Sequence, residues 1–280
     1  MSVNKFYAIN KSDETLAKLL KRADELKEEI LELRPKHPEL WSVIQEKLRV
    51  DWTYDSNAIE GSTLTRGETL FFLREGLTVE GKPLKDFLDA RNHAEAIDFL
   101  FEVIQRKRSI SPGLLKEINA LLLSGVSHTK ARDLDGNPIQ KPATPGEYKK
   151  LPNHVLQLDG TIHHYVEPLQ VPEEIEALCE WIAGDGAELH PAIRGAVAHY
   201  NFVRIHPFDD GNGRGARILM NLILMQDQFP PAIIRNEKRR AYIQALSKAD
   251  DGKLGPFVQF VATSVVETMK TVVEELRKQN

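Results

Sequence analysis

The sequence predicts a mainly α-helical fold with one small β-hairpin. Apolar residues recur at steps of three and four over most of the 280 residues, which is the period of a helix with one buried face. Helix-start signals, such as Ser111-Pro112 and the capping-box sequence Thr65-Arg66-Gly67-Glu68, occur between these stretches. No pair of βαβ units accompanies them, so a parallel-sheet fold is excluded.

Each expected helix is bounded by a start or stop signal. Ser12 is the expected N-cap of the first helix, and Pro35 ends it. The helix expected near residue 65 ends close to Gly76, a residue type that favours the left-handed C-terminal cap. In chain order the expected helices cover residues 12–34, 40–48, 65–76, 84–104, 112–123, 173–183, 191–204, 213–229, 238–249 and 256–278.

The helical pattern breaks between residues 124 and 171. This stretch is rich in proline and glycine, and a connection of such length inside a compact domain is usually functional or disordered. Two β-prone runs within 153–166 flank Asp159-Gly160, a pair that favours a two-residue type I′ turn. We therefore expect a hairpin that forms a lid or a docking edge, with a solvated loop as the alternative.

Composition and charge narrow the function classes. Lys and Arg number 37 against 41 Asp and Glu, and this formal net charge of −4 argues against nucleic-acid binding. A 41% hydrophobic and 28% charged composition is typical of soluble globular proteins. No apolar run approaches the roughly 18 residues that span a bilayer, so a membrane protein is not expected. Cys179 is the single cysteine, which favours a reducing, cytoplasmic location.

Residues 206–217, which read HPFDDGNGRGAR, contain the backbone features of a phosphate site. Gly211 and Gly213 allow backbone N–H groups to approach an anion without a Cβ in the way. The helix expected after Gly213 adds unpaired N–H donors and the positive end of its dipole. The sequence therefore predicts that an anion, most simply a phosphate, binds at this turn.

Charged side chains surround the same turn. Arg214 and Arg217 lie on one face of the expected helix and can contact successive phosphates. Asp210 is placed to hold Mg²⁺ that bridges phosphate oxygens, and His206 can accept a hydroxyl proton near neutral pH. Each residue alone is more often structural, but their concentration in twelve residues favours a functional site.

Other nucleotide and metal motifs do not fit. Gly211-x-Gly213-x-x-Ala216 matches the loose dinucleotide fingerprint, but that fingerprint must follow a buried strand and residues 192–204 read as a helix. The chain has no P-loop sequence, and its histidines and single cysteine lack the spacing of a structural zinc site.

Residues 206–217 resemble the Fic motif, H-P-F-x-[DE]-G-N-G-R-x-x-R, with no mismatch at its fixed positions. The resemblance implies an all-helical Fic fold that transfers AMP from ATP to a hydroxyl group of a target protein. It also implies a role for each residue of the motif and for one residue nearer the C-terminus. By position, these are His206 as general base, Asp210 as Mg²⁺ ligand, Gly211, Asn212 and Gly213 at the α-phosphate, Arg214 on the phosphate chain, Arg217 at the γ-phosphate and Tyr242 near the adenine.

A second resemblance lies upstream. Ser56-Asn57-Ala58-Ile59-Glu60-Gly61 is similar to the inhibitory motif [ST]-x-x-x-E-[GN] of Fic proteins that carry their own inhibitory helix. It implies an inhibitory helix around 54–61, in which Glu60 forms a forked ion pair with Arg217 and so removes the partner of the γ-phosphate. The expected organisation is an N-terminal helical extension, 1–80, followed by a Fic core, 81–280.

The resemblance also suggests partners. ATP is the implied substrate, and a target protein would present a Ser, Thr or Tyr hydroxyl at the hairpin, 153–166, by adding a strand to it. A homodimer is compatible with the sequence. Three alternatives remain open at this point: removal of AMP, with Glu60 positioning a water, transfer of another phosphate-containing group, and a non-enzymatic DNA-binding regulator.

Overall fold

The structure, a computed structural model, describes residues 6–9, 13–132, 137–153, 155–156 and 162–278. Over these ranges most of the chain is helical, as the sequence predicts. The α-helices are α1 (Glu14–Leu33), α2 (Pro38–Ile59), α3 (Arg66–Glu75), α4 (Leu84–Gln105), α5 (Pro112–Leu122), α6 (Val171–Ala183), α7 (Pro191–Ile205), α8 (Asn212–Gln226), α9 (Arg239–Asp250) and α10 (Gly255–Arg277).

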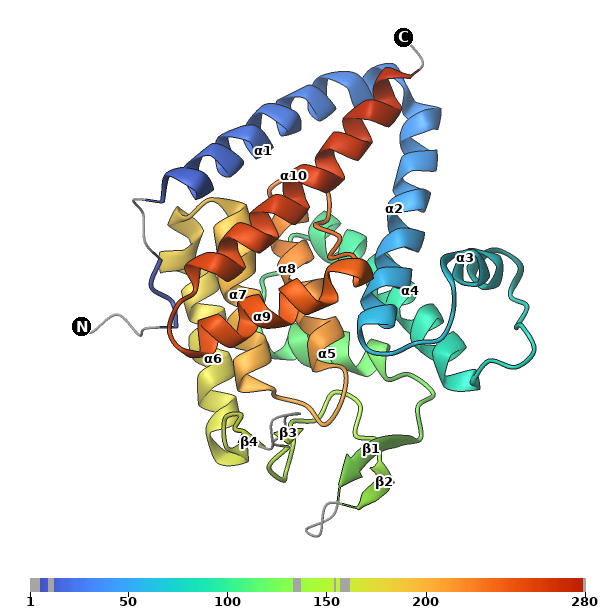
Figure 1. Cartoon of the computed structure of the whole chain (residues 1–280), viewed down its shortest axis with the longest axis vertical. Coiled ribbons are helices and arrows are strands. Elements are labelled where there is room, and N and C mark those ends of the chain that lie inside the picture. The colour runs from blue at the N-terminus through green and yellow to red at the C-terminus, as the bar shows by residue number, and fades with distance from the viewer. Residues whose placement is uncertain (1–5, 10–12, 133–136, 154, 157–161, 279–280) are drawn as a thin grey trace.

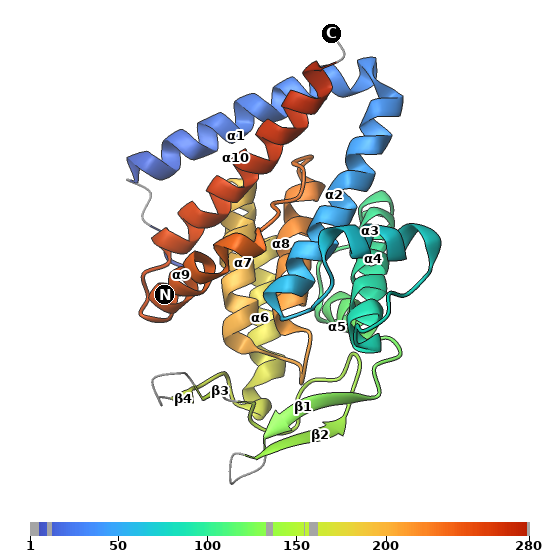
Figure 2. The same cartoon turned by 45° about the vertical axis from the view of Figure 1, so that its right-hand side comes forward.

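Helices α7 and α8 lie at the centre, and the other helices surround them (Figure 1). The two approach closely because Gly195 of α7 lacks a Cβ, which would lie 3.1 Å from the carbonyl oxygen of Met220 in α8. Helices α1 and α10 lie side by side across one end of the molecule, and α2 runs from that end towards the turn between α7 and α8 (Figures 1 and 2). The C-terminal end of α2 is therefore next to the predicted site.

One buried apolar cluster joins the N-terminal helices to the rest of the chain. Leu26 of α1, Trp52 of α2 and Val265 of α10 all belong to it. The apolar stripes that the sequence predicts on these helices therefore meet in a common core, which stabilises the position of α2. The division into an extension, 1–80, and a core, 81–280, stays a prediction.

Two small antiparallel sheets lie at the end of the molecule opposite α1 and α10 (Figure 2). In the predicted hairpin, β3 (Val155–Leu156) pairs with β4 (Ile162–His163), while its expected turn at Asp159-Gly160 lies outside the described residues. A second pair, β1 (His128–Arg132) and β2 (Pro138–Pro142), was not expected from the sequence. Prolines at both ends of β2 concealed it, because proline is tolerated in strands only at edges and ends.

Two boundaries differ from the sequence prediction. Asp13, not Ser12, caps α1, because its carboxylate accepts a hydrogen bond from the Leu16 backbone N–H at 2.9 Å. The helix expected at 40–48 and the inhibitory helix expected around 54–61 are parts of one continuous helix, α2. The capping box at Thr65 and the left-handed Gly76 cap are both present, as predicted for α3.

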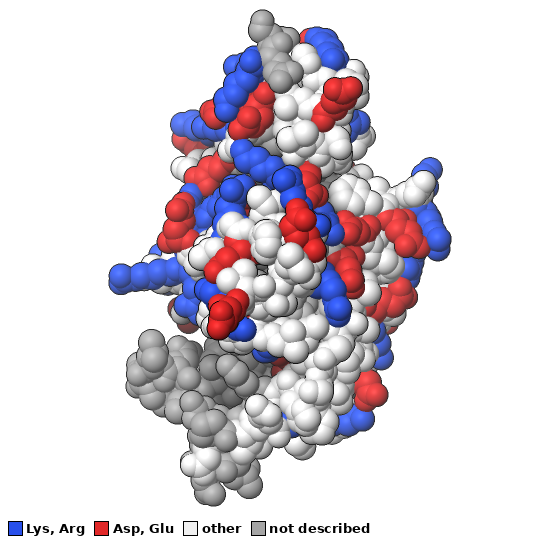
Figure 3. All heavy atoms as spheres, turned by 90° about the vertical axis from the view of Figure 1, so that its right-hand side faces the viewer, with Lys and Arg blue, Asp and Glu red and all other residues white. Residues whose placement is uncertain are grey.

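Charges of both signs alternate on the face formed by α2, α3 and α4. Figure 3 shows Lys and Arg interspersed with Asp and Glu over this face, with no continuous basic patch. This side of the molecule therefore lacks the electrostatic pattern of a nucleic-acid-binding surface. Among the described helices, none combines the length and the apolar character needed to cross a membrane.

Candidate active site

The turn between α7 and α8 is held by its own residues. The Asn212 side chain accepts a hydrogen bond from the Phe208 backbone N–H at 2.9 Å and donates one to the Phe208 carbonyl at 2.7 Å. Gly211 has a φ of 79°, a left-handed conformation that glycine adopts without strain. The turn is therefore closed before α8 begins, and the first N–H groups of α8 face outward from its end.

His206 lies at the end of α7 with its imidazole beside this turn. Its φ of 51° is also left-handed, which directs the side chain away from the helix axis. Its Nδ1 lies 3.3 Å from the Val203 carbonyl oxygen, which can only accept, so Nδ1 carries the proton and Nε2 is left as the base. Burial and the nearby Lys149 ammonium lower the pKa of His206 from 6.5 to about 3, so the ring is neutral at pH 7.

A set of residues that the sequence analysis missed supports this histidine. Tyr165 stacks on the His206 ring, with centroids 3.8 Å apart and planes at 20°. Lys149 is buried and donates from its backbone N–H to the Pro207 carbonyl at 2.8 Å, and its ammonium donates to Asn153 at 2.8 Å. Burial lowers the pKa of Lys149 to about 8. No periodicity or motif singles out Lys149, because its contacts depend on how the loop from 143 to 153 folds under the turn. Tyr165 lies in the segment 153–166, for which the sequence predicts a hairpin but no contact with His206.

Asp210 places its carboxylate at the turn. Its Oδ1 accepts the Gly211 backbone N–H at 2.6 Å and lies 3.5 Å from Nη2 of Arg214. Among the described residues, no cluster of three or more His, Cys, Asp or Glu side chains forms a metal cage. One carboxylate at a phosphate-binding turn nevertheless fits Mg²⁺, which proteins usually hold through one or two carboxylates together with substrate phosphates and water.

Arg214 forms a buried ion pair that the sequence did not reveal. Its Nη1 donates to Asp89 of α4 at 2.6 Å, and both side chains are almost fully buried. Lys85 also contacts the other oxygen of Asp89. The Arg214 head is thereby fixed beside Asp210, where it faces the turn. Asp89 lies 125 residues away in sequence, so only the folded chain brings the two together.

Arg217 is the most densely bonded side chain of the site. Its Nε donates to the Ser56 hydroxyl at 3.0 Å, and its Nη2 donates to the Ser56 carbonyl at 2.9 Å and to Oε1 of Glu60 at 2.7 Å. The Glu60 pair is therefore a single contact rather than the forked one that was expected, because Ser56 accepts from Nε and Nη1 lies near the Tyr242 hydroxyl. Ser56 and Glu60 are four residues apart, so both reach Arg217 from the last turn of α2.

Tyr242 lies behind Arg217. Its hydroxyl is 3.5 Å from Nη1 of Arg217 and 3.0 Å from Nε2 of His199, and its side chain is buried. Burial lowers the pKa of His199 well below 6.5 and raises the pKa of Tyr242, so both groups are neutral. In this structure Tyr242 thus contacts the arginine that was predicted to bind phosphate, whereas its predicted contact with adenine stays a prediction.

Glu60 covers the start of α8. A Cβ on Gly213 would collide with Oε1 of Glu60, so the carboxylate lies directly over the Gly213 backbone. Burial raises the pKa of Glu60, but Arg217, Arg214 and Arg239 outweigh it, and the net pKa is lowered. Its side chain is 44% exposed, whereas that of Arg217 is 2% exposed. Gly61 follows with a φ of 95°, which ends α2 sharply after this carboxylate.

A cavity of about 120 Å³ joins these groups. It brings together seven of the residues that the sequence singled out, whereas Ser56, Gly61, Arg217 and Tyr242 lie outside its lining. The lining residues are Glu60, His206, Asp209, Asp210, Gly211, Asn212, Gly213 and Arg214. The Asn212 side chain is bonded to the Phe208 backbone, and its predicted role at the α-phosphate stays a prediction.

The chain is thus a helical protein in which the N-terminus of α8 lies beside a neutral histidine. Residues 109–224 match the Fic/DOC family model. This region of the chain is therefore a Fic domain, as the motif at 206–217 predicts.

Two curated relatives carry the name protein adenylyltransferase. One from Nematostella vectensis is 34% identical over 77% of this chain and 47% of its own length, and one from Caenorhabditis elegans is 32% identical over 75% and 38%. The chain thus spans about half or less of the relatives it matches.

Solved structures have the same fold. A Fic-domain signalling protein from Bacteroides thetaiotaomicron has a TM-score of 0.81 at 27% identity, and the match covers 92% of this chain and 97% of that one. Fic-1 from C. elegans, residues 134–508, has a TM-score of 0.77 at 28% identity over 92% of this chain and 71% of its own. Both likenesses extend well beyond residues 109–224, so the helices around the Fic domain are part of the shared architecture.

Proposed function

We propose that this chain is a protein adenylyltransferase that transfers AMP from ATP to a hydroxyl side chain of a protein. The observation that carries the proposal is the shared cavity: the neutral imidazole of His206 lines the same space as the first backbone N–H groups of α8. A base beside an anion-binding helix terminus is what phosphoryl-group transfer needs. The names of the relatives support the nature of the group transferred.

The proposed reaction follows from the positions of these residues. Nε2 of His206 accepts the proton of the target hydroxyl, whose oxygen attacks the α-phosphorus of ATP, and pyrophosphate leaves. Because Val203 fixes the Nδ1 proton, the imidazole presents its lone pair without a change of tautomer. Backbone N–H groups at Gly211 and Gly213 stabilise negative charge on the α-phosphate. Asp210 is the proposed Mg²⁺ ligand, and the cation would neutralise charge on the phosphates.

Glu60 is the proposed inhibitory residue. Its carboxylate lies over Gly213 and contacts Arg217, the proposed partner of the γ-phosphate. A triphosphate in this position would meet a negative charge and an arginine that is already paired. ATP would therefore bind weakly, or with its α-phosphorus out of line for attack. Ser56 contributes by holding Arg217 in the orientation that Glu60 meets.

The target is proposed to bind along the hairpin formed by β3 and β4. An edge strand can pair with an extended peptide through backbone hydrogen bonds, which would bring a Ser, Thr or Tyr hydroxyl towards His206. We also propose a cytoplasmic location, since Cys179 is buried and unbridged. We also propose a homodimer. The contact between Glu60 and Arg217 lies within one chain, which supports inhibition within that chain.

Labelling with ATP that is radioactive at the α-phosphate, in the presence of Mg²⁺, tests the proposal, because the β- and γ-phosphates leave as pyrophosphate. We expect Glu60→Gly to raise incorporation of label into the protein or an added target at least tenfold over wild type. Glu60→Gly combined with His206→Ala should abolish it, because the base is lost. Glu28→Gly, on the exposed face of α1, is the matched control and should behave as wild type. Intact mass should increase by one AMP, and any other added mass, or equal labelling in all variants, would contradict the proposal.

A further inference from the structure

The backbone at His206 is strained. Its φ of 51° and ψ of 59° are left-handed, which is unfavourable for a residue with a side chain. Such a conformation persists only where the surrounding structure holds it. The same conformation brings Nδ1 to the Val203 carbonyl and so leaves Nε2 as the base. The reactive nitrogen therefore depends on whatever holds the backbone on both sides of His206.

Two residues of the loop 143–153 hold this backbone. The carbonyl groups of residues 205 to 208 all accept hydrogen bonds from Lys149 or Asn153. In chain order, the donors are the Lys149 ammonium at 3.4 Å, Asn153 Nδ2 at 3.5 Å, the Lys149 backbone N–H at 2.8 Å and Asn153 Nδ2 at 2.9 Å. The Lys149 ammonium also donates to Asn153 Oδ1 at 2.8 Å, so the two side chains hold each other. We call Lys149 and Asn153 the clamp.

The ammonium of the clamp is expensive to bury. Lys149 is 2% exposed, and burial lowers its pKa to about 8. A hydrocarbon side chain of similar length would be buried at a lower cost. Its Nζ also lies 5.8 Å from the centre of the Tyr165 ring, which stacks on the imidazole of His206. Lys149 therefore reaches both the backbone beneath His206 and the ring that covers it.

The clamp acts from outside the cavity. Neither Lys149 nor Asn153 is among the residues that line the space of about 120 Å³ beside His206. Asn153 lies two residues before Val155, the first residue of β3 in the hairpin proposed to bind the target. One short segment thus leads from the backbone of the base to the proposed docking strand.

We propose that Lys149 and Asn153 are positioning residues for AMP transfer, whose bonds to residues 205–208 keep His206 in the orientation that presents an unprotonated Nε2 to the target hydroxyl. The proposal rests on the proposed function. Without the clamp, the backbone relaxes from the left-handed conformation and Nδ1 loses the Val203 carbonyl. The ring proton is then free to move to Nε2, which removes the base.

Two variants remove the polar atoms of the clamp and keep side chains of similar size. These are Lys149→Met and Asn153→Leu, and thermal unfolding shows whether each is folded. Lys150→Met is the matched control, because Lys150 is the next residue, its side chain is 78% exposed and it pairs with Glu147. All three are made in the Glu60→Gly protein, in which transfer is expected to be fast.

The first measurement separates kcat from KM. We expect kcat for transfer to fall about tenfold or more in Lys149→Met and in Asn153→Leu, while KM for ATP stays within about twofold. Lys150→Met should match the Glu60→Gly parent in both constants. A rise in KM that accounts for the lost activity, or a kcat equal to that of Lys150→Met in both clamp variants, would overturn the positioning role.

The second measurement needs no ATP. The ring nitrogens of His206 are observed by ¹⁵N NMR near neutral pH and assigned by their absence in His206→Ala. The parent and Lys150→Met should carry the proton on Nδ1, and the clamp variants should show a larger share on Nε2. The same tautomer in all four proteins would overturn the proposal. If Glu60→Gly transfers no AMP while the tautomers change as expected, the proposed function fails and the clamp on His206 stands.

Discussion

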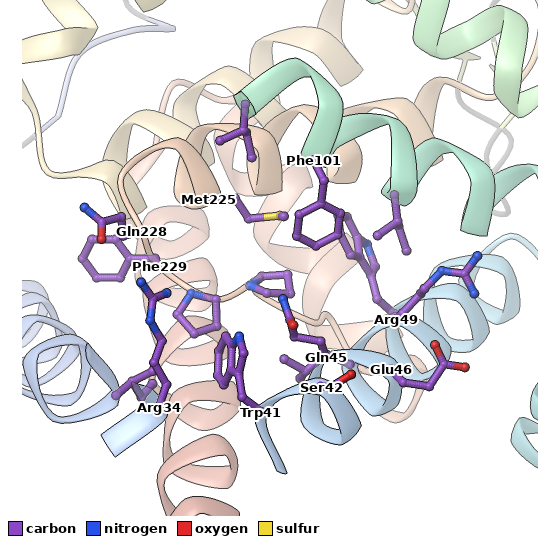
Figure 4. A pocket seen from close by; sticks show the side chains of 17 residues that line it. Arg34, Trp41, Ser42, Gln45, Glu46, Arg49, Phe101, Met225, Gln228 and Phe229 are labelled. Carbon is purple, nitrogen blue, oxygen red and sulfur yellow. The ribbon is translucent and has the colours of Figure 1, made fainter. Parts of the chain in front are cut away.

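The last turn of α2 and the turns before it make different kinds of contact with the rest of the chain. In the last turn, Ser56 and Glu60 bond to a buried arginine. In the preceding turns, Trp41 and Trp52 border a cavity of about 540 Å³ (Figure 4), and the buried indole donor of Trp52 has no acceptor among the described residues. The difference teaches that one helix makes specific polar contacts in its last turn and apolar contacts beside a cavity in the turns before it.

Of the changes considered, low pH should have the largest effect on the polar contacts around the C-terminal end of α2. His93 and His199 are fully buried, and burial together with nearby arginines lowers the pKa of both well below 6.5. Their unfolded-state pKa is near 6.5, so the unfolded chain binds more protons at acidic pH and stability falls as pH decreases below about 6.5. His206 adds a third such ring, since its pKa is lowered to about 3. We expect the three together to lower the free energy of unfolding by about 6 kcal/mol between pH 7 and pH 5, measured with urea.

A variant at His199 sharpens this prediction. His199→Gln keeps a partner for the Tyr242 hydroxyl but has no titrating ring, so it should remove about a third of the pH dependence. The exposed His128 provides the control, and His128→Gln should leave the slope unchanged. A pH profile of His199→Gln parallel to that of wild type would contradict the assignment.

Removing the carboxylate at the C-terminal end has the next largest effect. Glu60→Gln leaves the Arg217 charge buried with only neutral partners, and we expect unfolding free energy to fall by about 2 kcal/mol. This figure is below the usual cost of breaking a buried pair, because Glu60 is partly exposed. Transfer activity should rise at the same time. Urea unfolding and labelling of one preparation check both, and a variant that gains stability would contradict the prediction.

Loss of the Ser56 hydroxyl has a smaller effect. Ser56→Ala removes the acceptor of Arg217 Nε, while the Ser56 carbonyl still accepts from Nη2. We expect a cost of about 1 kcal/mol, since an unsatisfied buried donor is only partly offset by the better helix propensity of alanine. Ser42→Ala, on the exposed surface of the same helix, is the control, and equal stability of the two variants would show that the hydroxyl contributes nothing.

The smallest effect is expected beside the large cavity. Trp52→Phe removes ring area but also removes the unpartnered indole N–H. We expect unfolding free energy to change by less than about 1 kcal/mol, compared with the 3–5 kcal/mol typical of truncating a core tryptophan to alanine. Urea unfolding measures it. A loss of several kcal/mol would mean that the indole packs as tightly as the rest of the core.

How well the sequence predicts a contact depends on how far apart in the sequence its residues lie. Helices α3 and α5 are predicted closely, because Thr65, Gly76 and Ser111 act on neighbouring backbone groups. The Fic motif likewise places His206 and the turn, since its residues lie within one short segment. The pairing of Arg214 with Asp89 has no such local signal, because it depends on α4 packing against α8.

Sequence reasoning described two parts of α2 without joining them, for a physical reason. The apolar period that marks residues 40–48 changes after Leu48, where the helix is buried on several sides and carries Asp51, Asp55 and Asn57 inside the protein. A helix buried on several sides loses the simple amphipathic stripe, so its continuation to Ile59 is not visible in the pattern. The contact between Glu60 and Arg217 was found through the motif, but its single-oxygen geometry depends on Ser56.

The unequal exposure of Glu60 and Arg217 has a consequence for salt. The guanidinium is enclosed by protein and stays where it is, whereas the carboxylate reaches water at 44% exposure. Dissolved ions therefore screen the pair from the glutamate side alone, and small anions that arrive from solvent meet a cation already held in place. Rising ionic strength should therefore weaken this contact gradually. It should loosen the last turn of α2 without unfolding the helix.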